Sequence, residues 1–122
     1  MSLFKNVNVI SYFVTDWERG KEFYARVLGW PEAYVDDQMG WAEWGKENET
    51  HIAIRRLGEN ETLNIGNSAD AVLSVEDADA ALKALRGMGV RCDDVVRIPG
   101  MVNYGVFYDP DGNSIQFASF NV

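Results

Sequence analysis

Residues 107–117, FYDPDGNSIQF, decide the fold of this chain. The Asp-Pro pair opens a tight turn, because the proline ring fixes φ, and Gly112 is able to adopt a positive φ. After the turn, polar and apolar residues alternate as Ser-Ile-Gln-Phe, which places the apolar side chains on one face of a strand. The stretch therefore predicts a β-hairpin near the end of the chain, with Gln116 on the face opposite the core residues.

Length and composition predict one globular domain. The chain has 122 residues, of which 47% are hydrophobic and 12% aromatic, and this is too apolar for a disordered chain. The net charge of −8 and the absence of a Lys/Arg cluster disfavour a nucleic-acid partner. No apolar run approaches the ~20 residues that span a bilayer, and the first residues do not resemble a secretory signal. We expect a soluble protein.

The single cysteine predicts a reducing compartment. Cys92 has no second cysteine to pair with, so we expect a cytoplasmic protein without an internal disulfide. Asp93 and Asp94 follow it directly and would raise the pKa of its thiol, which makes it a poor nucleophile. We interpret Cys92 as structural.

The first half of the chain predicts a strand, a helix and three further strands. The first strand covers residues 8–14, and Thr15 and Asp16 are candidate N-caps, with Glu18 completing a Thr-x-x-Glu box. The helix is expected to end at Gly29, a suitable C′ residue. The later strands are expected at residues 33–36, 40–44 and 50–55.

The second half repeats this pattern. A strand at 70–75 and a helix at 77–89 recur about 60 residues after their counterparts, and 114–117 corresponds to 51–54. The repeat predicts an α+β fold of two βαβββ modules, at about 5–57 and 69–122, with a polar linker at 58–68. We expect the two modules to share one sheet system, because neither closes a core alone.

The period of the strands sorts their residues into two faces. One face has no charged residue and must pack on the helices: Ile10, Tyr12, Val14, Ile52, Ile54, Ala71, Leu73, Val75, Ile115 and Phe117. The other face mixes polar and apolar groups, as the lining of a ligand pocket does: Val9, Ser11, Phe13, His51, Ala53, Arg55, Asp70, Val72, Ser74, Ser114, Gln116 and Ala118. The alternative for this second face is contact with water, which antiparallel sheets allow.

The repeat, the helix end FYARVLGW and the hairpin FYDPDGNSIQF resemble the glyoxalase / bleomycin-resistance / extradiol-dioxygenase group, the vicinal oxygen chelate superfamily. The resemblance covers nearly the whole chain. It implies that the two modules form a curved, mixed-sheet cup around one site. It also implies a homodimer, because small members of the family usually pair, often with each cup built from both chains.

The resemblance further implies four metal-ligand positions, on the first and last strand of each module. They correspond to Val9, Asp70, Ala53 and Gln116 in this sequence. Val9 and Ala53 have no donor atoms, and one carboxylate with one amide is a poor set for Ni, Zn or Fe. We therefore expect no metal cofactor. A substituted divalent site with His51 and Glu43 is the alternative.

Several functions stay open at this point. The first is metal-free binding of a small organic molecule, as in the antibiotic-sequestering relatives. The second is a metal-dependent lyase, isomerase or dioxygenase with a non-standard ligand set, and an enzyme here would resemble lactoylglutathione lyase or a dioxygenase. The third is metal-independent acid–base catalysis by Asp70, His51 or Glu43. The fourth is a non-enzymatic partner-binding module. The expected ligand-binding residues are Val9, Ser11, Phe13, Trp41, Trp44, His51, Ala53, Arg55, Asp70, Tyr104 and Gln116, with Tyr108 as an alternative wall to Tyr104.

Three details depend on tertiary structure. Alternation does not say whether Trp41 or Trp44 faces the site, and core packing is the alternative for both. Arg55 and Asp70 are expected to couple on the mixed face, because a carboxylate in an apolar cavity needs a partner; the alternative is that Arg55 extends into water. The segment 97–103, RIPGMVN, is expected to form a lip of the pocket.

Overall fold

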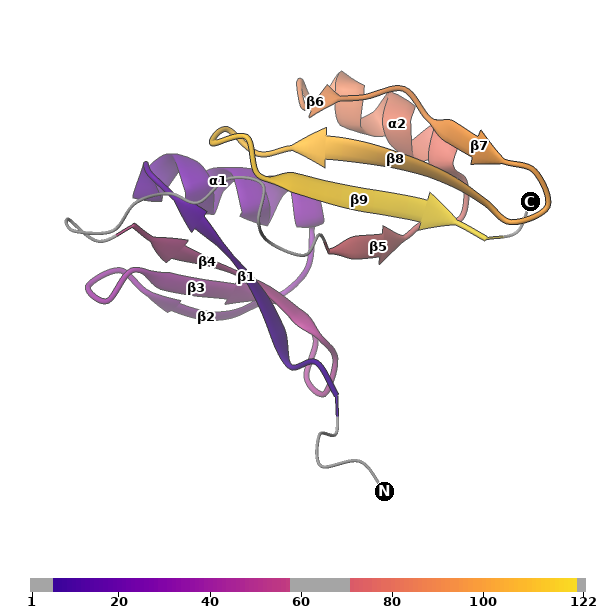
Figure 1. The fold of residues 1–122 in the computed structure, drawn as a ribbon. Coiled ribbons are helices and arrows are strands. Elements are labelled where there is room, and N and C mark those ends of the chain that lie inside the picture. Colours follow the sequence, from indigo (N-terminus) through magenta and orange to yellow (C-terminus); the bar gives the residue numbers. More distant parts are fainter. Residues whose placement is uncertain (1–5, 58–70, 121–122) are drawn as a thin grey trace. The chain divides into compact units, whose positions relative to one another are not determined.

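A computed structural model describes residues 6–57 and 71–120 (Figure 1). The chain divides into two compact units, Met1–Leu63 and Asn64–Val122. Each unit has its own sheet, of four and five strands respectively. Among the described strands, each sheet pairs only within its own unit, so the prediction of one shared sheet is wrong, whereas the predicted α+β fold of two modules is confirmed. The expected linker at 58–68 and Asp70 lie outside the described residues.

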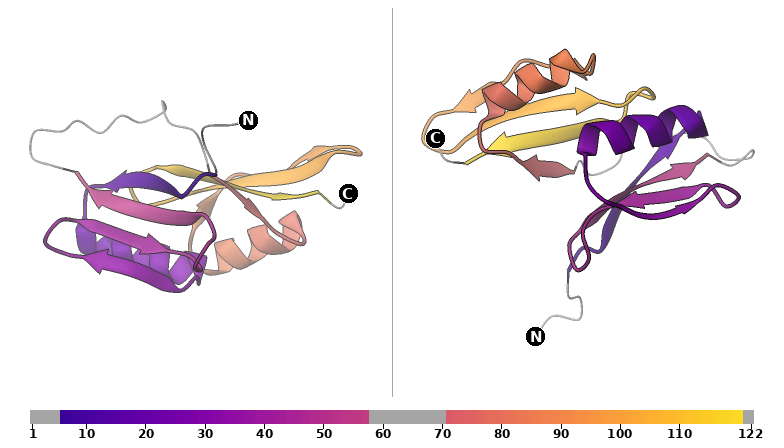
Figure 2. Two further views of the ribbon diagram at one scale, coloured as in Figure 1. Left: turned by 90° about the horizontal axis from the view of Figure 1, so that it is seen from below. Right: turned by 180° about the vertical axis from the view of Figure 1, so that it is seen from behind.

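The first unit is a βαβββ module. Its strand order is β1-β4-β3-β2, with β1 parallel to β4 and the other pairs antiparallel. The parallel pair requires a crossover, which α1 supplies. The elements are β1 (Val9–Val14), α1 (Trp17–Leu28), β2 (Glu32–Asp36), β3 (Trp41–Trp44) and β4 (His51–Arg56). Helix α1 lies along one face of this sheet (Figure 2).

The second unit repeats the plan with one change. Strand β5 pairs in parallel with β9, β9 pairs with β8, and both β6 and β7 pair with β8. One expected strand is thus split into two short ones. The elements are β5 (Val72–Ser74), α2 (Ala78–Gly87), β6 (Arg91–Cys92), β7 (Val96–Ile98), β8 (Val102–Tyr108) and β9 (Ser114–Ser119). The segment 97–103 is the β7–β8 hairpin, in which Gly100 has a φ of 74°.

Aspartates cap both helices. The Asp16 carboxylate accepts from the Arg19 amide, and the Asp77 carboxylate caps α2 in the same way. The predicted Thr-x-x-Glu box is wrong, because the N-cap is Asp16 and Glu18 is then one position too early to close the box. Helix α1 ends at Gly29 in the left-handed conformation, as predicted.

The core of the first unit is aromatic. The ring of Tyr24, on α1, lies between Tyr12 and Trp44, with centroid distances of 6.2 Å and 6.1 Å. Val14 and Ile54 are fully buried beside them. Four of the predicted helix-facing side chains of β1 and β4 are therefore in the core, namely Tyr12, Val14, Ile52 and Ile54, whereas Ile10 is half-buried. Trp44 joins the core at 2% exposure.

The second core depends on a close approach to a glycine. Phe117 on β9 and Phe107 on β8 are buried, with their ring centroids 6.2 Å apart. A Cβ at Gly105 would overlap the Phe117 ring, so the absence of a side chain there lets the ring lie flat on β8. Ile115 completes this face of β9, opposite Gln116.

The β8–β9 turn is organised by a buried carboxylate. Asp109 is 4% exposed, and its Oδ1 accepts from the amides of Asp111 (2.9 Å) and Asn113 (2.8 Å). Its Oδ2 accepts from the Asn113 side-chain amide at 2.8 Å. Gly112 has a φ of 86°, as the turn prediction requires. Asp109 therefore holds the β8–β9 turn in its conformation by accepting hydrogen bonds from residues of the turn.

We expect Asp109→Ala to lower the free energy of unfolding by about 1–2 kcal/mol, because two backbone amides lose a charged acceptor. Asp109→Asn keeps one acceptor oxygen and should lose about half as much. Urea denaturation of the three proteins measures this. Equal stability of Asp109→Ala and the parent protein would contradict the role given to this carboxylate.

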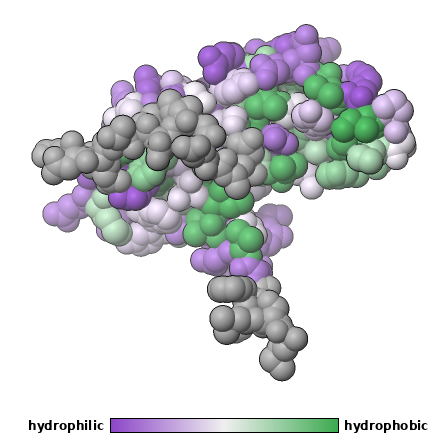
Figure 3. Space-filling model, in the orientation of Figure 1, coloured by the Kyte–Doolittle hydropathy of each residue, from purple (hydrophilic) through white to green (hydrophobic). Residues whose placement is uncertain are grey.

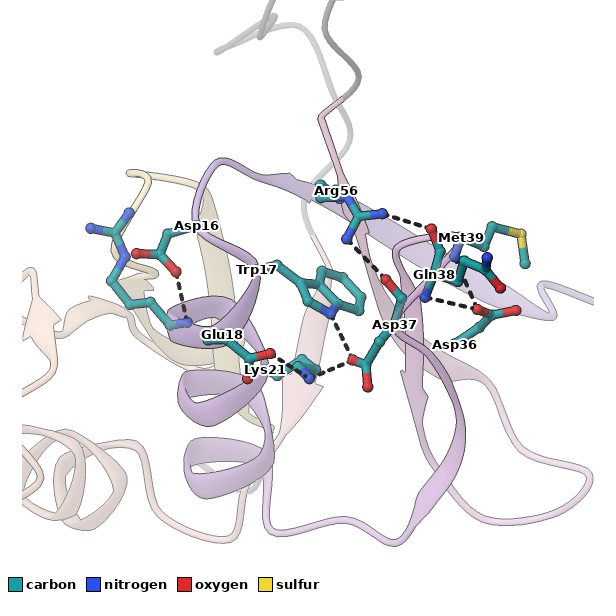
Figure 4. A network of polar contacts seen from close by, with 10 residues as sticks. Asp16, Trp17, Glu18, Lys21, Asp36, Asp37, Gln38, Met39 and Arg56 are labelled. Carbon is teal, nitrogen blue, oxygen red and sulfur yellow. Dashed lines mark hydrogen bonds and ion pairs between the residues drawn. The ribbon is translucent and has the colours of Figure 1, made fainter.

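A polar network ties α1 to the β2–β3 turn (Figure 4). The indole N–H of Trp17 donates to Asp37 Oδ1 at 2.8 Å, and Lys21 forms an ion pair with the same carboxylate. Arg56 donates to the backbone carbonyls of Asp37 and Gln38 at 2.9 Å and 2.8 Å. The charged groups of this network contact one another and backbone carbonyls, so we assign the network a structural role rather than a role in ligand binding.

Candidate functional site

The face of the first sheet turned away from α1 carries the candidate site. We call it the open face of the first unit. Strand β1 contributes Val9, Ser11 and Phe13, β4 contributes His51, Ala53 and Arg55, and β3 contributes Trp41 and Glu43. The register aligns Phe13, Arg55 and Trp41 in one row across three strands. Six of the side chains predicted for the mixed face therefore share one surface with Trp41 and Glu43.

The two tryptophans of β3 point to opposite faces. Trp44 stacks on Tyr24 in the core and does not line the open face, which is the core-packing alternative that the sequence left open for it. Trp41 lies on the open face, where its indole N–H donates to Glu43 Oε2 at 2.8 Å. This bond fixes the edge of the Trp41 ring. The side of the sheet that α1 covers therefore decides which of the two tryptophans is in the core.

Glu43 also pairs with His51. Its Oε1 lies 2.7 Å from His51 Nδ1, and His51 Nε2 lies 2.8 Å from the Lys46 carbonyl oxygen. The two side chains are 21% and 19% exposed. A Cβ at Gly45 would overlap the imidazole, and Gly45 has a φ of 151°. The glycine therefore makes room for the ring to lie against the start of the 45–50 loop.

These contacts determine the protonation of His51. A carbonyl oxygen only accepts hydrogen bonds, so Nε2 must carry a proton, and an ionised carboxylate requires a proton on Nδ1 as well. The geometry thus fits an imidazolium with both N–H groups donating. In this state His51 has no lone pair for a metal or for abstracting a proton.

The electrostatics of the pair agree with this assignment. The hydrogen bond to Glu43 raises the pKa of His51 above its ordinary value of 6.5, with the Lys46 carbonyl next in effect. The Trp41 indole is the largest cause of the lowered pKa of Glu43, and His51 adds to it. Burial opposes both shifts, because it penalises charge.

Arg55 occupies the middle of the aromatic row. Its guanidinium carbon lies 4.7 Å from the centre of the Phe13 ring, a cation–π distance. Trp41 is its register partner on the other side, in β3. Ser11, the fully buried Ala53 and Glu43 form the next row. The arrangement places a cationic side chain in one row with two aromatic side chains.

A hollow of about 340 Å³ lies at the end of the same unit. It is lined by Gly29, Trp30, Pro31, Gly45, Lys46, Glu49 and Thr50. Helix α1 ends here, and the loop that holds the Lys46 carbonyl against His51 forms the other wall. Sequence reasoning missed Lys46, because it contributes a backbone carbonyl and no side-chain signal.

The second sheet has an apolar open face, turned away from α2. Tyr104 aligns with Ala118, Val106 with Gln116, and Tyr108 with Ser114. Apolar surface gathers on this face in the space-filling view (Figure 3). The exposed large hydrophobics Val72 and Val96 extend it, at 52% and 45% exposure. Gln116 is thus a polar group in the middle of an apolar surface.

One end of this second face is polar. The Tyr108 hydroxyl donates to Asp93 at 2.6 Å, and the Arg91 guanidinium lies 4.2 Å from the centre of the Tyr108 ring. The prediction named Tyr108 but missed its two partners, which come from β6 and the residue after it. The antiparallel pairing of β6 with β8 brings them beside Tyr108.

The family's metal positions do not fit a metal. Val9 and Ala53 lie on the same face of adjacent strands but carry no donor atoms, and Gln116 is a neutral amide. Asp70 lies outside the described residues. His51 and Glu43, the alternative ligands, hold each other. Within residues 6–57 and 71–120, no three His, Cys, Asp or Glu side chains gather as a metal site would require.

The thiol of Cys92 is half-buried and has a raised pKa. Burial is the largest cause, ahead of the neighbouring Asp93, whereas Arg86 opposes the shift. From the sequence, only Asp93 and Asp94 were expected to raise this pKa. The thiol is a weak nucleophile.

Among the described residues, no helix is long and apolar enough to cross a membrane.

Three solved structures share this fold over most of both chains. TnmS3, an antibiotic binding protein from Streptomyces sp. CB03234, is 23% identical with a TM-score of 0.79, over 99% of this chain and 100% of that one. A glyoxalase family protein from Bacillus anthracis is 19% identical, with a TM-score of 0.79 over 99% of both chains. Lactoylglutathione lyase from Agrobacterium tumefaciens is 13% identical, with a TM-score of 0.71 over 93% and 92%. These likenesses establish the fold alone.

No curated protein matches this chain. A family model described as "Glyoxalase/Bleomycin resistance protein/Dioxygenase superfamily" matches residues 6–117. The match covers both modules, from the first strand to the FYDPDGNSIQF hairpin on which the resemblance rested. The chain belongs to the glyoxalase / bleomycin resistance protein / dioxygenase superfamily.

Proposed function

We propose that the protein binds a small organic molecule on its open sheet faces without a metal ion. The observation that carries this proposal is the first unit's open face. There the aromatic rings of Phe13 and Trp41 flank Arg55, while the family's metal positions are Val9 and Ala53. Aromatic and small apolar surfaces with a few placed polar groups are typical of ligand sites.

An antibiotic binding protein and a lyase both share this fold, so the choice of binding over catalysis rests on the residues of the site. Metal-dependent lyase or dioxygenase chemistry needs several strong donors, and the described residues supply two groups that bind each other. Catalysis with His51 as a base is also disfavoured, because the contacts of its two ring nitrogens fit an imidazolium, which has no lone pair to accept a proton. We further propose a cytoplasmic homodimer, supported by the lone cysteine and by the exposed Val72 and Val96. A monomer of 13.7 kDa in light scattering would refute the dimer.

A thermal-shift screen with aromatic antibiotics, catechols, dicarbonyl–thiol adducts and divalent metals tests the function. A bound ligand stabilises the native state by mass action, so at about 100 times its Kd it should add about 2.7 kcal/mol. We expect organic hits and no shift with metals, and no stoichiometric transition metal by elemental analysis. One tightly held metal ion per chain would favour the lyase or dioxygenase alternative. No shift with any compound would refute the proposal.

A further inference from the structure

We infer that the hollow at the end of the first unit is a second binding site, which takes small organic ammonium ions. Its volume of about 340 Å³ is at the lower end of the range of small-molecule sites. None of its lining residues belongs to the open face, so the inference goes beyond the proposed function and does not depend on it. The inference rests on a tryptophan, on the charges around the hollow and on the contacts that hold its walls.

Trp30 is the tryptophan on the wall of the hollow. The indole N–H groups of Trp17 and Trp41 donate to carboxylates, and Trp44 stacks in the core. Trp30 is half-buried, and in the described part of the chain its ring has neither a hydrogen bond nor an aromatic partner. With Pro31 it supplies the apolar part of the wall. An indole suits the organic body of a ligand and also attracts a cation.

The ionisable side chains around the hollow favour a cation. Glu49 and Lys46 both line it, and among the described residues neither side chain forms an ion pair. Glu47 belongs to the same exposed loop, and Glu32 directly follows Pro31. The segments that line the hollow therefore carry three carboxylates and one ammonium group.

The other charges close to the hollow are paired. His51 Nδ1 lies 2.7 Å from Glu43 Oε1, and Arg26 Nε lies 2.7 Å from Glu22 Oε1. His51 also interacts electrostatically with Glu49, but Glu43 is its hydrogen-bonded counter-charge. The C-cap of α1 lines the hollow too, and it adds the negative end of the helix dipole. The balance of charge at the hollow is therefore negative.

Hydrogen bonds hold the two walls of the hollow in place. The Gly45 amide donates to the Pro31 carbonyl at 2.9 Å, which joins one wall to the other. The Lys46 carbonyl oxygen accepts from the Glu49 amide at 3.2 Å and lies 2.8 Å from His51 Nε2. The walls are therefore positioned before a ligand binds, which reduces the entropy that binding costs.

Benzylammonium and its neutral analogue benzyl alcohol test the inference, in an NMR titration of the backbone amides at neutral pH and physiological ionic strength. We expect benzylammonium to bind about fivefold more tightly than the alcohol, because a partly exposed carboxylate and a helix end each favour a cation modestly. The amide signals that move should be those of residues 29–30 and 45–50, which localises the site.

Three variants assign the charges. Glu49→Gln should reduce the preference for benzylammonium to less than about twofold and leave the affinity for benzyl alcohol unchanged. Glu47→Gln removes the same charge from the same loop, outside the lining, and should leave the preference above about threefold, because salt screens the more distant charge. Lys46→Met keeps the backbone carbonyl and removes a repelling ammonium, so it should strengthen benzylammonium binding about twofold.

Any of four outcomes would overturn the inference. They are no binding of either probe, equal affinity for both probes, amide shifts confined to residues outside the walls of the hollow, and equal effects of Glu49→Gln and Glu47→Gln. The proposed function is tested separately by the thermal-shift screen, so either can fail while the other stands.

Discussion

Replacing Trp44 by alanine should lower the free energy of unfolding by about 3–5 kcal/mol, the usual cost of removing a large aromatic side chain from a core. Trp44 is 2% exposed and stacks on Tyr24, whose ring also packs on Tyr12. The cavity would form at the contact between α1 and the sheet. Chemical denaturation measures the loss.

Trp41→Ala is the matched control, because Trp41 is the same residue type three positions earlier in the same strand. It should cost about 1 kcal/mol, through the lost hydrogen bond to Glu43, but it should weaken binding of any aromatic ligand found in the thermal-shift screen. A Trp41→Ala protein that is less stable than Trp44→Ala would invert the assignment of the two faces. Unchanged ligand affinity would remove Trp41 from the site.

The Glu43–His51 pair should make stability depend on pH. His51 has a raised pKa in the folded protein, so its contribution is fully present below its ordinary value of 6.5 and is lost as pH rises through the raised pKa. Glu43 has a lowered pKa, so its contribution is present above its ordinary value of 4.5 and is lost as pH falls through the lowered one. The pair therefore stabilises most between these limits.

We expect Glu43→Gln to cost about 2–3 kcal/mol near pH 6, because it leaves a largely buried imidazolium without its counter-charge. Its stability should also fall less than that of the parent protein between about pH 6 and about pH 9. Urea denaturation at several pH values measures both effects. Glu47→Gln, in the exposed 45–50 loop, is the control for loss of a carboxylate. Parallel pH profiles for Glu43→Gln and the parent protein would show that His51 is neutral.

A neutral imidazole has one N–H, so above the pKa of His51 either the Glu43 bond or the Lys46 bond must be lost. The charge-assisted bond to Glu43 is the stronger of the two. The 45–50 loop should therefore be released first, and it forms part of the 340 Å³ hollow. Hydrogen exchange of the loop amides across the same pH range would report this directly.

Local sequence pattern was sufficient to predict both helices and the faces of β1, β4 and β9, but not the division of one strand into β6 and β7. Period-two alternation in β1, β4 and β9 placed Tyr12, Ile54 and Phe117 on the core face. The assignment holds for a whole strand at once, because a shift of one residue moves every side chain of the strand to the other face. Local chemistry also placed the helix end at Gly29 and the hairpin at Asp109–Asn113. The repeat and the hairpin together were sufficient to identify the family, which the match over residues 6–117 confirms.

Tertiary structure decided what depends on neighbours distant in the sequence. Alternation puts Trp41 and Trp44 on different faces but does not say which face the helix covers, and only α1 settles this by stacking Tyr24 on Trp44. The protonation state of His51 depends on the backbone carbonyl of Lys46. Every residue has such a carbonyl, so the sequence does not indicate which one contacts the imidazole. The division into two sheets likewise depends on which edges form hydrogen bonds, and strand period carries no information about pairing partners.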